Sequence, residues 1–112
     1  MSRFGFESEA HGPVAVVALR GELDLLSTAE LEPELLRLSE EPGIGVLALD
    51  LRDLEFMDSS GLRLVVLVER RLRETGRRLV LVRGPQMVQR VFEITRMEER
   101  LEFVDAPERI QP

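Results

Sequence analysis

Short apolar runs alternate along this chain with longer segments in which apolar residues recur at helical intervals, and this alternation limits the fold to few architectures. Residues 46–51 and 78–83 are almost continuously apolar, which is typical of strands that are covered on both faces. Segments of helical period separate and follow them. Strands and helices in alternation predict an α/β domain whose parallel strands are joined by right-handed crossovers.

The first two strands are expected to pair as an antiparallel hairpin at one edge of the sheet. Residues 4–9 alternate apolar and polar side chains, as a half-exposed edge strand does. Residues 11–13, His-Gly-Pro, supply turn chemistry. Residues 14–19 are apolar throughout, which predicts a strand covered on both faces. The sheet is therefore expected to be mixed, with this hairpin joined to parallel strands.

Three helices are expected between and after the strands. Ser27, followed by Glu30, fits a capping box that starts the first helix. Pro33 is expected to interrupt this helix, because proline removes a helical hydrogen bond, so that a second helical segment runs to about Glu40. The remaining expected elements are the longest helix at 60–75, closed by Gly76, a third helix that opens with Pro85 as its first residue, and a last strand at 101–104.

The residue inventory excludes several kinds of site. There is no Cys, hence no disulfide, thiol nucleophile or thiolate metal site. The single histidine, His11, is interpreted as a turn residue and cannot build a His-rich metal site. All fifteen basic residues are Arg, which removes a phosphate-binding or Schiff-base lysine. A serine without a base is a weak nucleophile, so we expect no enzyme activity, no cofactor and no metal.

Charge is unevenly distributed along the chain. Residues 61–90 hold eight Arg against two acids, whereas the rest holds seven Arg against nineteen acids. The net charge of −6 and the lack of Trp and Tyr argue against nucleic-acid binding. No apolar run reaches the length of a signal peptide or of a membrane span of about 18 residues. We therefore expect a cytoplasmic protein without membrane insertion.

Polar residues gather where the central strand passes into the longest helix. Asp58, Ser59 and Ser60 stand there, before Gly61 and Leu62. Ligand sites of α/β sheets concentrate at the carboxyl ends of parallel strands, where helices begin. Each of the three polar residues is also a good helix N-cap, and a helix needs only one. By themselves, these residues favour a capping role over a functional one.

The sequence resembles the STAS domain of anti-sigma factor antagonists. The blocks that carry this resemblance are residues 21–24 (Gly-Glu-Leu-Asp), 27–29 (Ser-Thr-Ala), 46–51 and 56–62 (Phe-Met-Asp-Ser-Ser-Gly-Leu). They imply one STAS domain over residues 1–112, with a mixed, mostly parallel sheet packed with helices, an ordered core at about 3–105 and a short tail at 106–112. Two features depart from the family: Thr95-Arg96-Met97 replaces a frequent Thr-Gly-Leu turn, and the tail is short for a terminal helix.

The resemblance implies partner switching in transcription regulation. The unphosphorylated protein binds an anti-sigma factor serine/threonine kinase and frees the sigma factor, phosphorylation of Ser59 abolishes binding, and a PP2C-type phosphatase restores it. The alternative is a STAS docking subunit of a transporter ATPase or a sensory complex, without phosphorylation. The expected partner-binding residues are Asp24, Asp58, Ser59, Ser60, Gly61, Arg63 and Leu67. We expect a monomer or a weak homodimer.

Individual roles are also expected for the residues of this segment. Ser60 is expected to cap the helix and Ser59 to stay free, because a capping hydroxyl is a poorer kinase substrate. A phosphoryl group on Ser59 is expected to meet free backbone N–H groups at the helix start. Asp58 either orients the Ser59 hydroxyl or binds near the kinase's metal, or it is a turn acid. Leu67 falls among the charged positions of the helix. It is either part of a contact patch for the partner or an ordinary exposed leucine.

Overall fold

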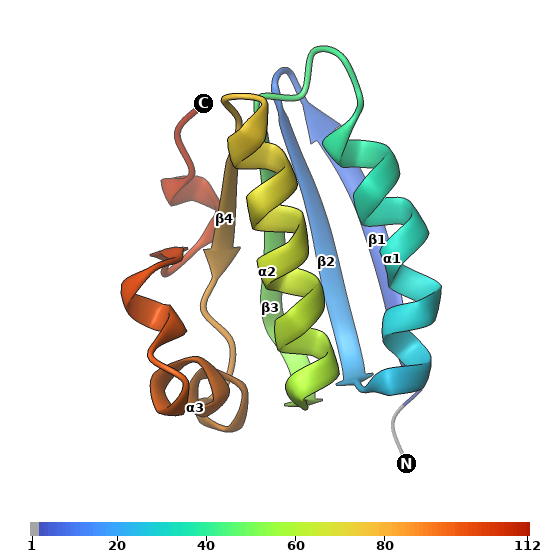
Figure 1. Ribbon diagram of the computed structural model, residues 1–112, viewed down its shortest axis with the longest axis vertical. Coiled ribbons are helices and arrows are strands. Elements are labelled where there is room, and N and C mark those ends of the chain that lie inside the picture. Colours follow the sequence, from blue (N-terminus) through green and yellow to red (C-terminus); the bar gives the residue numbers. More distant parts are fainter. Residues whose placement is uncertain (1–2) are drawn as a thin grey trace.

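The computed structural model describes residues 3–112 and contains a five-stranded sheet in the order β1-β2-β3-β4-β5 (Figure 1). β1 is antiparallel to β2, and all other neighbours are parallel, which confirms the predicted mixed sheet with an edge hairpin. The elements are β1 Gly5–His11, β2 Val14–Leu23, α1 Leu25–Ser39, β3 Val46–Met57, α2 Ser59–Glu74, β4 Arg78–Val82, α3 Gln86–Ile94, β5 Glu102–Val104 and two 3-10 helices, Met97–Glu99 and Pro107–Arg109. Within residues 3–112, no helix is long and apolar enough to cross a membrane.

The main core lies between the sheet and its helices. α1 and α2 lie side by side in front of the sheet, and α3 packs against the lower part of β3, beyond the end of β4 (Figure 1). Alternate residues of each strand point to this helix layer, since side chains alternate along a strand. The fully buried side chains of the core include Leu19, Leu31, Leu35, Leu47, Leu49, Val68, Leu72, Leu81, Val88 and Phe92.

The other face of the sheet carries no α-helix in the described chain and is covered over β3 and β4 by the C-terminal tail, which includes the 3-10 helix Pro107–Arg109. Val46 and Val80 belong to this face and are at most 2% exposed. Arg78 lies on the same face, and its Nη1 donates to the carbonyl of Gln111 at 2.8 Å. Residues 106–112, expected as a short tail outside the ordered core, fold back here. Because the tail stops short of β2, the prediction that residues 14–19 are covered on both faces is wrong: their outward side chains are half-exposed.

Helix α1 begins earlier than predicted and is continuous. Its N-cap is Asp24, whose Oδ1 accepts from the backbone N–H of Ser27 at 3.0 Å, while the hydroxyl of Ser27 accepts from the N–H of Asp24 at 2.8 Å. Ser27 therefore completes the capping box from inside the helix. Pro33 does not break the helix, because the carbonyl it leaves unpaired belongs to the exposed Ala29, where water can satisfy it.

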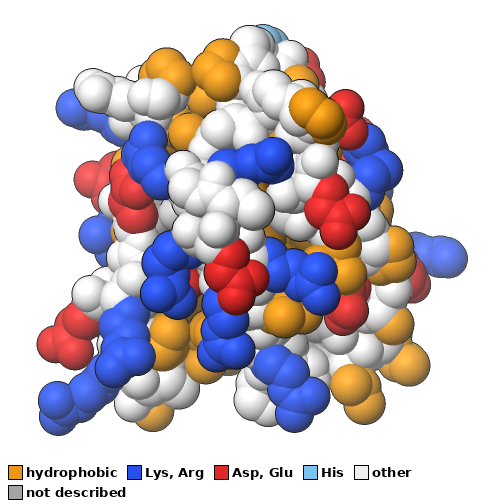
Figure 2. Space-filling view, turned by 45° about the horizontal axis from the view of Figure 1, so that its top comes forward, with side chains coloured by type: hydrophobic (Ala, Val, Ile, Leu, Met, Phe, Trp, Pro, Cys, Tyr) orange, Lys and Arg blue, Asp and Glu red, His pale blue; other side chains and the backbone are white. Residues whose placement is uncertain are grey.

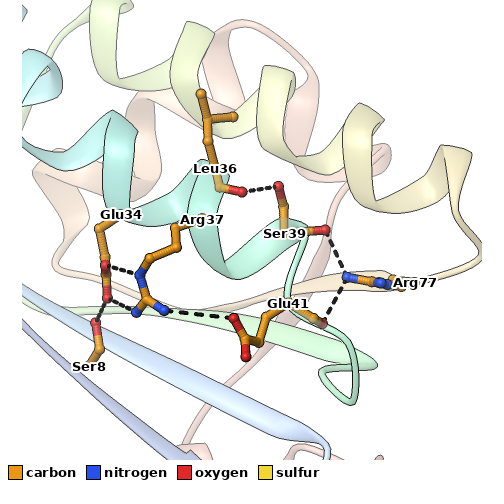
Figure 3. Close-up of polar contacts among 7 residues, drawn as sticks. All are labelled: Ser8, Glu34, Leu36, Arg37, Ser39, Glu41 and Arg77. Carbon is orange, nitrogen blue, oxygen red and sulfur yellow. Dashed lines mark hydrogen bonds and ion pairs between the residues drawn. The ribbon is translucent and has the colours of Figure 1, made fainter.

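Polar contacts hold both sides of α1 (Figure 3). Glu34 pairs with Arg37 at 2.9 Å and accepts from the hydroxyl of Ser8 on β1 at 2.8 Å. Arg77, which follows α2, donates to the carbonyls of Ser39 and Glu41 at 2.7 and 3.2 Å. The end of α1 is thus joined to the end of α2 by a single guanidinium.

Charged side chains are also unevenly distributed over the surface of the folded chain. Figure 2 shows blue Arg side chains gathered over the middle and lower left of the face that carries the helices. Arg63, Arg70, Arg71 and Arg73 belong to α2, and only Arg73 has an ion pair among the described residues, with Glu69 at 3.2 Å. The net acidic chain therefore presents a locally basic helix.

Helices α2 and α3 begin within one residue of their predicted positions, whereas β3 is longer than predicted. β3 continues past residue 51 to Met57, so only Asp58 separates it from α2. Pro85 is the N-cap of α3 rather than its first residue, and the side chain of Gln89 accepts from the N–H of Gly84 at 2.9 Å. The final strand and Gly76, at φ 73° after α2, agree with prediction.

Arg96 follows α3 in the left-handed region, at φ 62°, and is the one such non-glycine residue in the described chain. A side chain costs about 1 kcal/mol in this conformation, which glycine adopts freely. We therefore expect Arg96→Gly to raise the free energy of unfolding by roughly 1 kcal/mol, measured by urea denaturation. Arg96→Ala is the control and should give no such gain. A loss of stability in Arg96→Gly would contradict this account of the turn.

Candidate functional site

Two helix starts lie side by side at the carboxyl ends of β2 and β3, at the bottom of Figure 1. Leu23 and Met57 are partners in the parallel register, and each strand ends directly before an acid, Asp24 or Asp58. The N–H of Asp58 donates to the carbonyl of Leu23 at 3.2 Å, which ties the two starts together. Asp24 therefore lies at the same end of the sheet as the Asp58 segment. We call residues 24–28 and 58–63 the capped end.

Asp58 is the N-cap of α2. Its Oδ1 accepts from the backbone N–H groups of Ser60 at 2.9 Å and Gly61 at 3.3 Å. Of the two roles left open for Asp58, the structure supports the turn acid. The prediction that Ser60 is the cap is wrong, because a side chain two residues earlier already fills that position. Two of the N–H groups that a phosphoryl group was expected to meet, those of Ser60 and Gly61, are therefore already bonded to Asp58.

Ser59 and Ser60 differ in exposure rather than in bonding. Within residues 3–112, neither hydroxyl makes a hydrogen bond. Ser59 is the first residue of α2 and is exposed, whereas Ser60 is half-buried between the two helices. The more accessible nucleophile is thus the hydroxyl of Ser59.

Gly61 has a packing role. It is buried, and a Cβ atom there would lie 2.6 Å from Met57 Cγ and 3.0 Å from Leu23 Cδ2. The first turn of α2 therefore rests directly on the ends of β2 and β3. The close packing around this position requires a residue without a side chain, which explains the glycine. A contact of Gly61 with a partner stays a prediction.

A shallow groove of about 220 Å³ runs between α1 and α2 beside the serines. Ser60, Arg63 and Leu67 line it from α2, and Leu25 and Thr28 line it from α1. Leu67 was expected among exposed charged positions, but it is half-buried and packs against the core. Arg63 is exposed, lies one helical turn after Ser59, and has no ion pair within the described chain. All seven predicted site residues thus lie at the capped end or in this adjoining groove.

Exposed apolar side chains surround the capped end, and sequence reasoning missed them. Leu25 is 71% exposed, Leu26 is 80% exposed, and Phe56 at the end of β3 is 39% exposed. The available signal was a Leu-Leu pair directly after Asp24, outside the buried stripe of α1. Apolar side chains next to Arg63 and polar groups form the mixture that protein interfaces favour.

The Asp24 cap is anionic at neutral pH. The backbone N–H of Ser27, and then its hydroxyl, hold the pKa of Asp24 below its ordinary value of 3.8. Within residues 3–112, no group of three or more His, Asp or Glu residues is arranged to hold a metal ion. The capped end therefore offers a hydroxyl, apolar contacts and fixed charges.

The lowered pKa of Asp24 predicts an acid-sensitive contribution to stability. A carboxylate whose pKa is lower in the folded chain stabilises the fold above its ordinary pKa of 3.8, and this contribution is lost as the pH falls through the folded value. Asp24→Asn keeps an N-cap acceptor but cannot titrate. The difference in urea midpoint between pH 7 and about pH 3 should therefore be smaller in Asp24→Asn than in the parent. Equal differences would contradict the assignment.

Comparison with known proteins identifies relatives of the whole chain. An anti-sigma-B factor antagonist of Staphylococcus epidermidis is 28% identical over 102 residues, which cover 91% of this chain and 94% of that protein. A candidate anti-sigma factor antagonist of Bordetella bronchiseptica, BtrV, is 35% identical over 80 residues, which cover 71% of this chain and 68% of that protein.

Solved structures share the fold. An anti-sigma factor antagonist from Mycobacterium paratuberculosis superposes with a TM-score of 0.81 at 23% identity, covering 95% of this chain and 89% of that chain. SpoIIAA in its unphosphorylated form gives 0.80 at 24% identity, covering 93% of this chain and 91% of that chain. The phosphorylated form of SpoIIAA gives 0.74 at 23% identity, covering 93% and 95%. The STAS domain model matches residues 6–109, so this chain belongs to the STAS domain family.

Proposed function

We propose that this protein is an anti-sigma factor antagonist that binds an anti-sigma factor serine/threonine kinase through the capped end and is switched off by phosphorylation of Ser59. The observation that carries this proposal is the exposed Ser59 hydroxyl, left without a hydrogen bond because Asp58 already caps α2. Relatives at 28% and 35% identity carry the name of anti-sigma factor antagonist. This function is regulatory rather than enzymatic, and we place it in the cytoplasm with a monomer or weak homodimer as the acting form.

The chemistry of the proposed switch is a phosphoryl transfer. The Ser59 oxygen attacks the γ-phosphorus of ATP, the bond to the β-phosphate oxygen breaks, ADP leaves, and the hydroxyl proton passes to a base of the kinase. A PP2C-type phosphatase returns the hydroxyl by hydrolysis. None of these steps requires a catalytic group from this chain.

The position of Ser59 determines what the phosphoryl group would do. The N–H groups of Ser60 and Gly61 are already bonded to Asp58, so the phosphoryl oxygens would have to compete with that carboxylate for them. The group adds a charge of about −1.5 to −2 next to the Asp58 carboxylate. It would lie at the capped end, which also exposes Leu25 and Leu26, and a partner docked there would have to desolvate it. The proposed effect is therefore on binding and not on folding.

Phosphorylation in vitro tests this function against the alternative of a constitutive docking subunit. We expect incubation with ATP and the serine kinase encoded next to this gene to add one phosphoryl group, mapped to Ser59 by peptide mass spectrometry. Ser60→Ala should be phosphorylated as the parent is, and Ser59→Ala should gain no mass. If the parent gains no mass while it still forms a complex with the kinase, the protein is a docking module without a phosphorylation switch.

A further inference from the structure

The face of the sheet that carries no α-helix is only half covered. The tail lies over β3 and β4, whereas the outward side chains of β2 stay half-exposed. These side chains, Val14, Val16 and Ala18, form a continuous apolar row, because alternate residues of a strand share a face. A partner that covered this row would remove apolar surface from water, which makes its binding more favourable.

A groove of about 610 Å³ lies along this row. One wall is the β1–β2 hairpin, and the other is the tail, with Pro107, Ile110 and Pro112. Its floor is therefore apolar and its length follows β2. We call this cavity the tail groove.

The rim of the tail groove is acidic. Glu9 of β1 is the register partner of Val16 and projects to the same face, and Glu108 lines the opposite wall. The one Arg among the lining residues is Arg52, whose Nη2 lies 2.8 Å from Asp50 Oδ2. Hydrogen bonding to Asp50, with further contributions that include the charge of Glu108, raises the pKa of Arg52 above its ordinary value. Arg52 is thus already paired with Asp50. Glu9 Oε2 lies 3.7 Å from His11 Nε2, an exposed imidazole, and with histidine counted as neutral Glu9 and Glu108 leave an excess of negative charge.

We propose that the tail groove binds a short segment of a partner protein that carries apolar side chains flanked by Lys or Arg. The apolar row takes the aliphatic side chains, and Glu9 and Glu108 take the basic ones. A second copy of this chain fits less well, since two acidic rims would face each other.

The tail groove is separate from the capped end. It lies beside residues 11–18, at the start of β2, whereas the capped end follows Leu23. The ten residues of β2 span about 30 Å at about 3.3 Å each. A partner in the tail groove therefore leaves Ser59 accessible, and this inference does not depend on the proposed switch.

Binding of two matched peptides tests the proposal. The probes are a peptide that alternates Val and Lys and one that alternates Val and Glu, titrated into the full chain with labelled valine methyl groups. We expect the Val-Lys peptide to shift the methyl signals of Val14 and Val16 and to bind roughly tenfold more tightly than the Val-Glu peptide. The double variant Glu9→Gln with Glu108→Gln should weaken the Val-Lys peptide by about tenfold. Val16→Thr should weaken it as well, because a hydroxyl replaces a methyl group in the floor.

Charge-matched variants decide whether the effect is local. Glu98→Gln with Glu99→Gln removes the same charge from exposed positions outside the groove and should leave the affinity unchanged. An equal loss in this control, equal affinity for both peptides, or shifts centred on the capped end would overturn the proposal. A dimer in solution that Val16→Lys dissociates would assign the groove to a second copy instead.

Discussion

Ser59→Asp should fold as the parent does and bind the anti-sigma kinase about 100-fold more weakly, a change of about 2.7 kcal/mol. The fold is preserved because the side chain is exposed and the helix is already capped by Asp58. Binding is lost because the new carboxylate follows Asp58 directly at the capped end, which also exposes Leu25 and Leu26, and docking there would desolvate it. Calorimetric titration of the purified pair measures the affinity, and thermal unfolding measures the fold.

A neutral variant of similar size separates charge from shape. Ser59→Asn has nearly the volume of aspartate and should bind within about threefold of the parent, since no charge is desolvated. Ser59→Ala should also bind. If Ser59→Asp binds as tightly as the parent, the capped end is not the surface that phosphorylation controls.

Gly61→Val should lower the free energy of unfolding by roughly 3 kcal/mol, the upper range for overpacking a core position. Even a Cβ atom would approach Met57 Cγ to 2.6 Å and Leu23 Cδ2 to 3.0 Å, and a branched side chain adds further contacts. The first turn of α2 would then have to move away from the ends of β2 and β3. Urea denaturation and the thermal midpoint, which should fall by roughly 10 °C or more, measure the effect.

Partial relief by a second substitution shows that the clash is the cause. Met57→Ala removes the nearest atom, so Gly61→Ala in that background should cost less than Gly61→Ala alone. Ser60→Ala, at the half-buried neighbouring position, should change stability by less than about 0.5 kcal/mol. A Gly61→Val protein as stable as the parent would mean that α2 adapts at its start, and the packing role of Gly61 would then be wrong.

The order of elements could be predicted from the sequence because the spacing of apolar residues differs between strands and helices. The edge hairpin, the central strand that begins at Val46 and the helix ended by Gly76 agree with the structure. Sheet topology followed from chain connectivity, since strands joined by helices become parallel neighbours.

The helix starts could not be read in the same way. Asp, Ser and Thr all make good caps, so the choice depends on where the preceding strand ends. That end is a tertiary feature: β3 runs to Met57 because α3 and the second half of β2 continue to pack and pair with it. Asp58 thereby becomes the cap, and Ser60 moves into the helix.

The burial of individual side chains depended on neighbours distant in the chain. Leu67 falls outside the main stripe of α2 but lies against α1, which no local pattern indicates. The outward row of β2 reads like a fully covered strand, and only the short reach of the tail leaves it half-exposed. The resemblance related the residues of the capped end to one another, and their contacts with a partner stay a prediction.

The parallel arrangement of α1 and α2 has an electrostatic consequence. Each helix presents the positive end of its macrodipole, equivalent to about half an elementary charge, at the same edge of the sheet. Together with Arg63, these ends nearly balance the carboxylates of Asp24 and Asp58. The unmodified surface is thus close to local neutrality and suits apolar docking, whereas one phosphoryl group leaves about two negative charges without a counter-charge. The same covalent change on an already charged surface would alter the local field far less in relative terms.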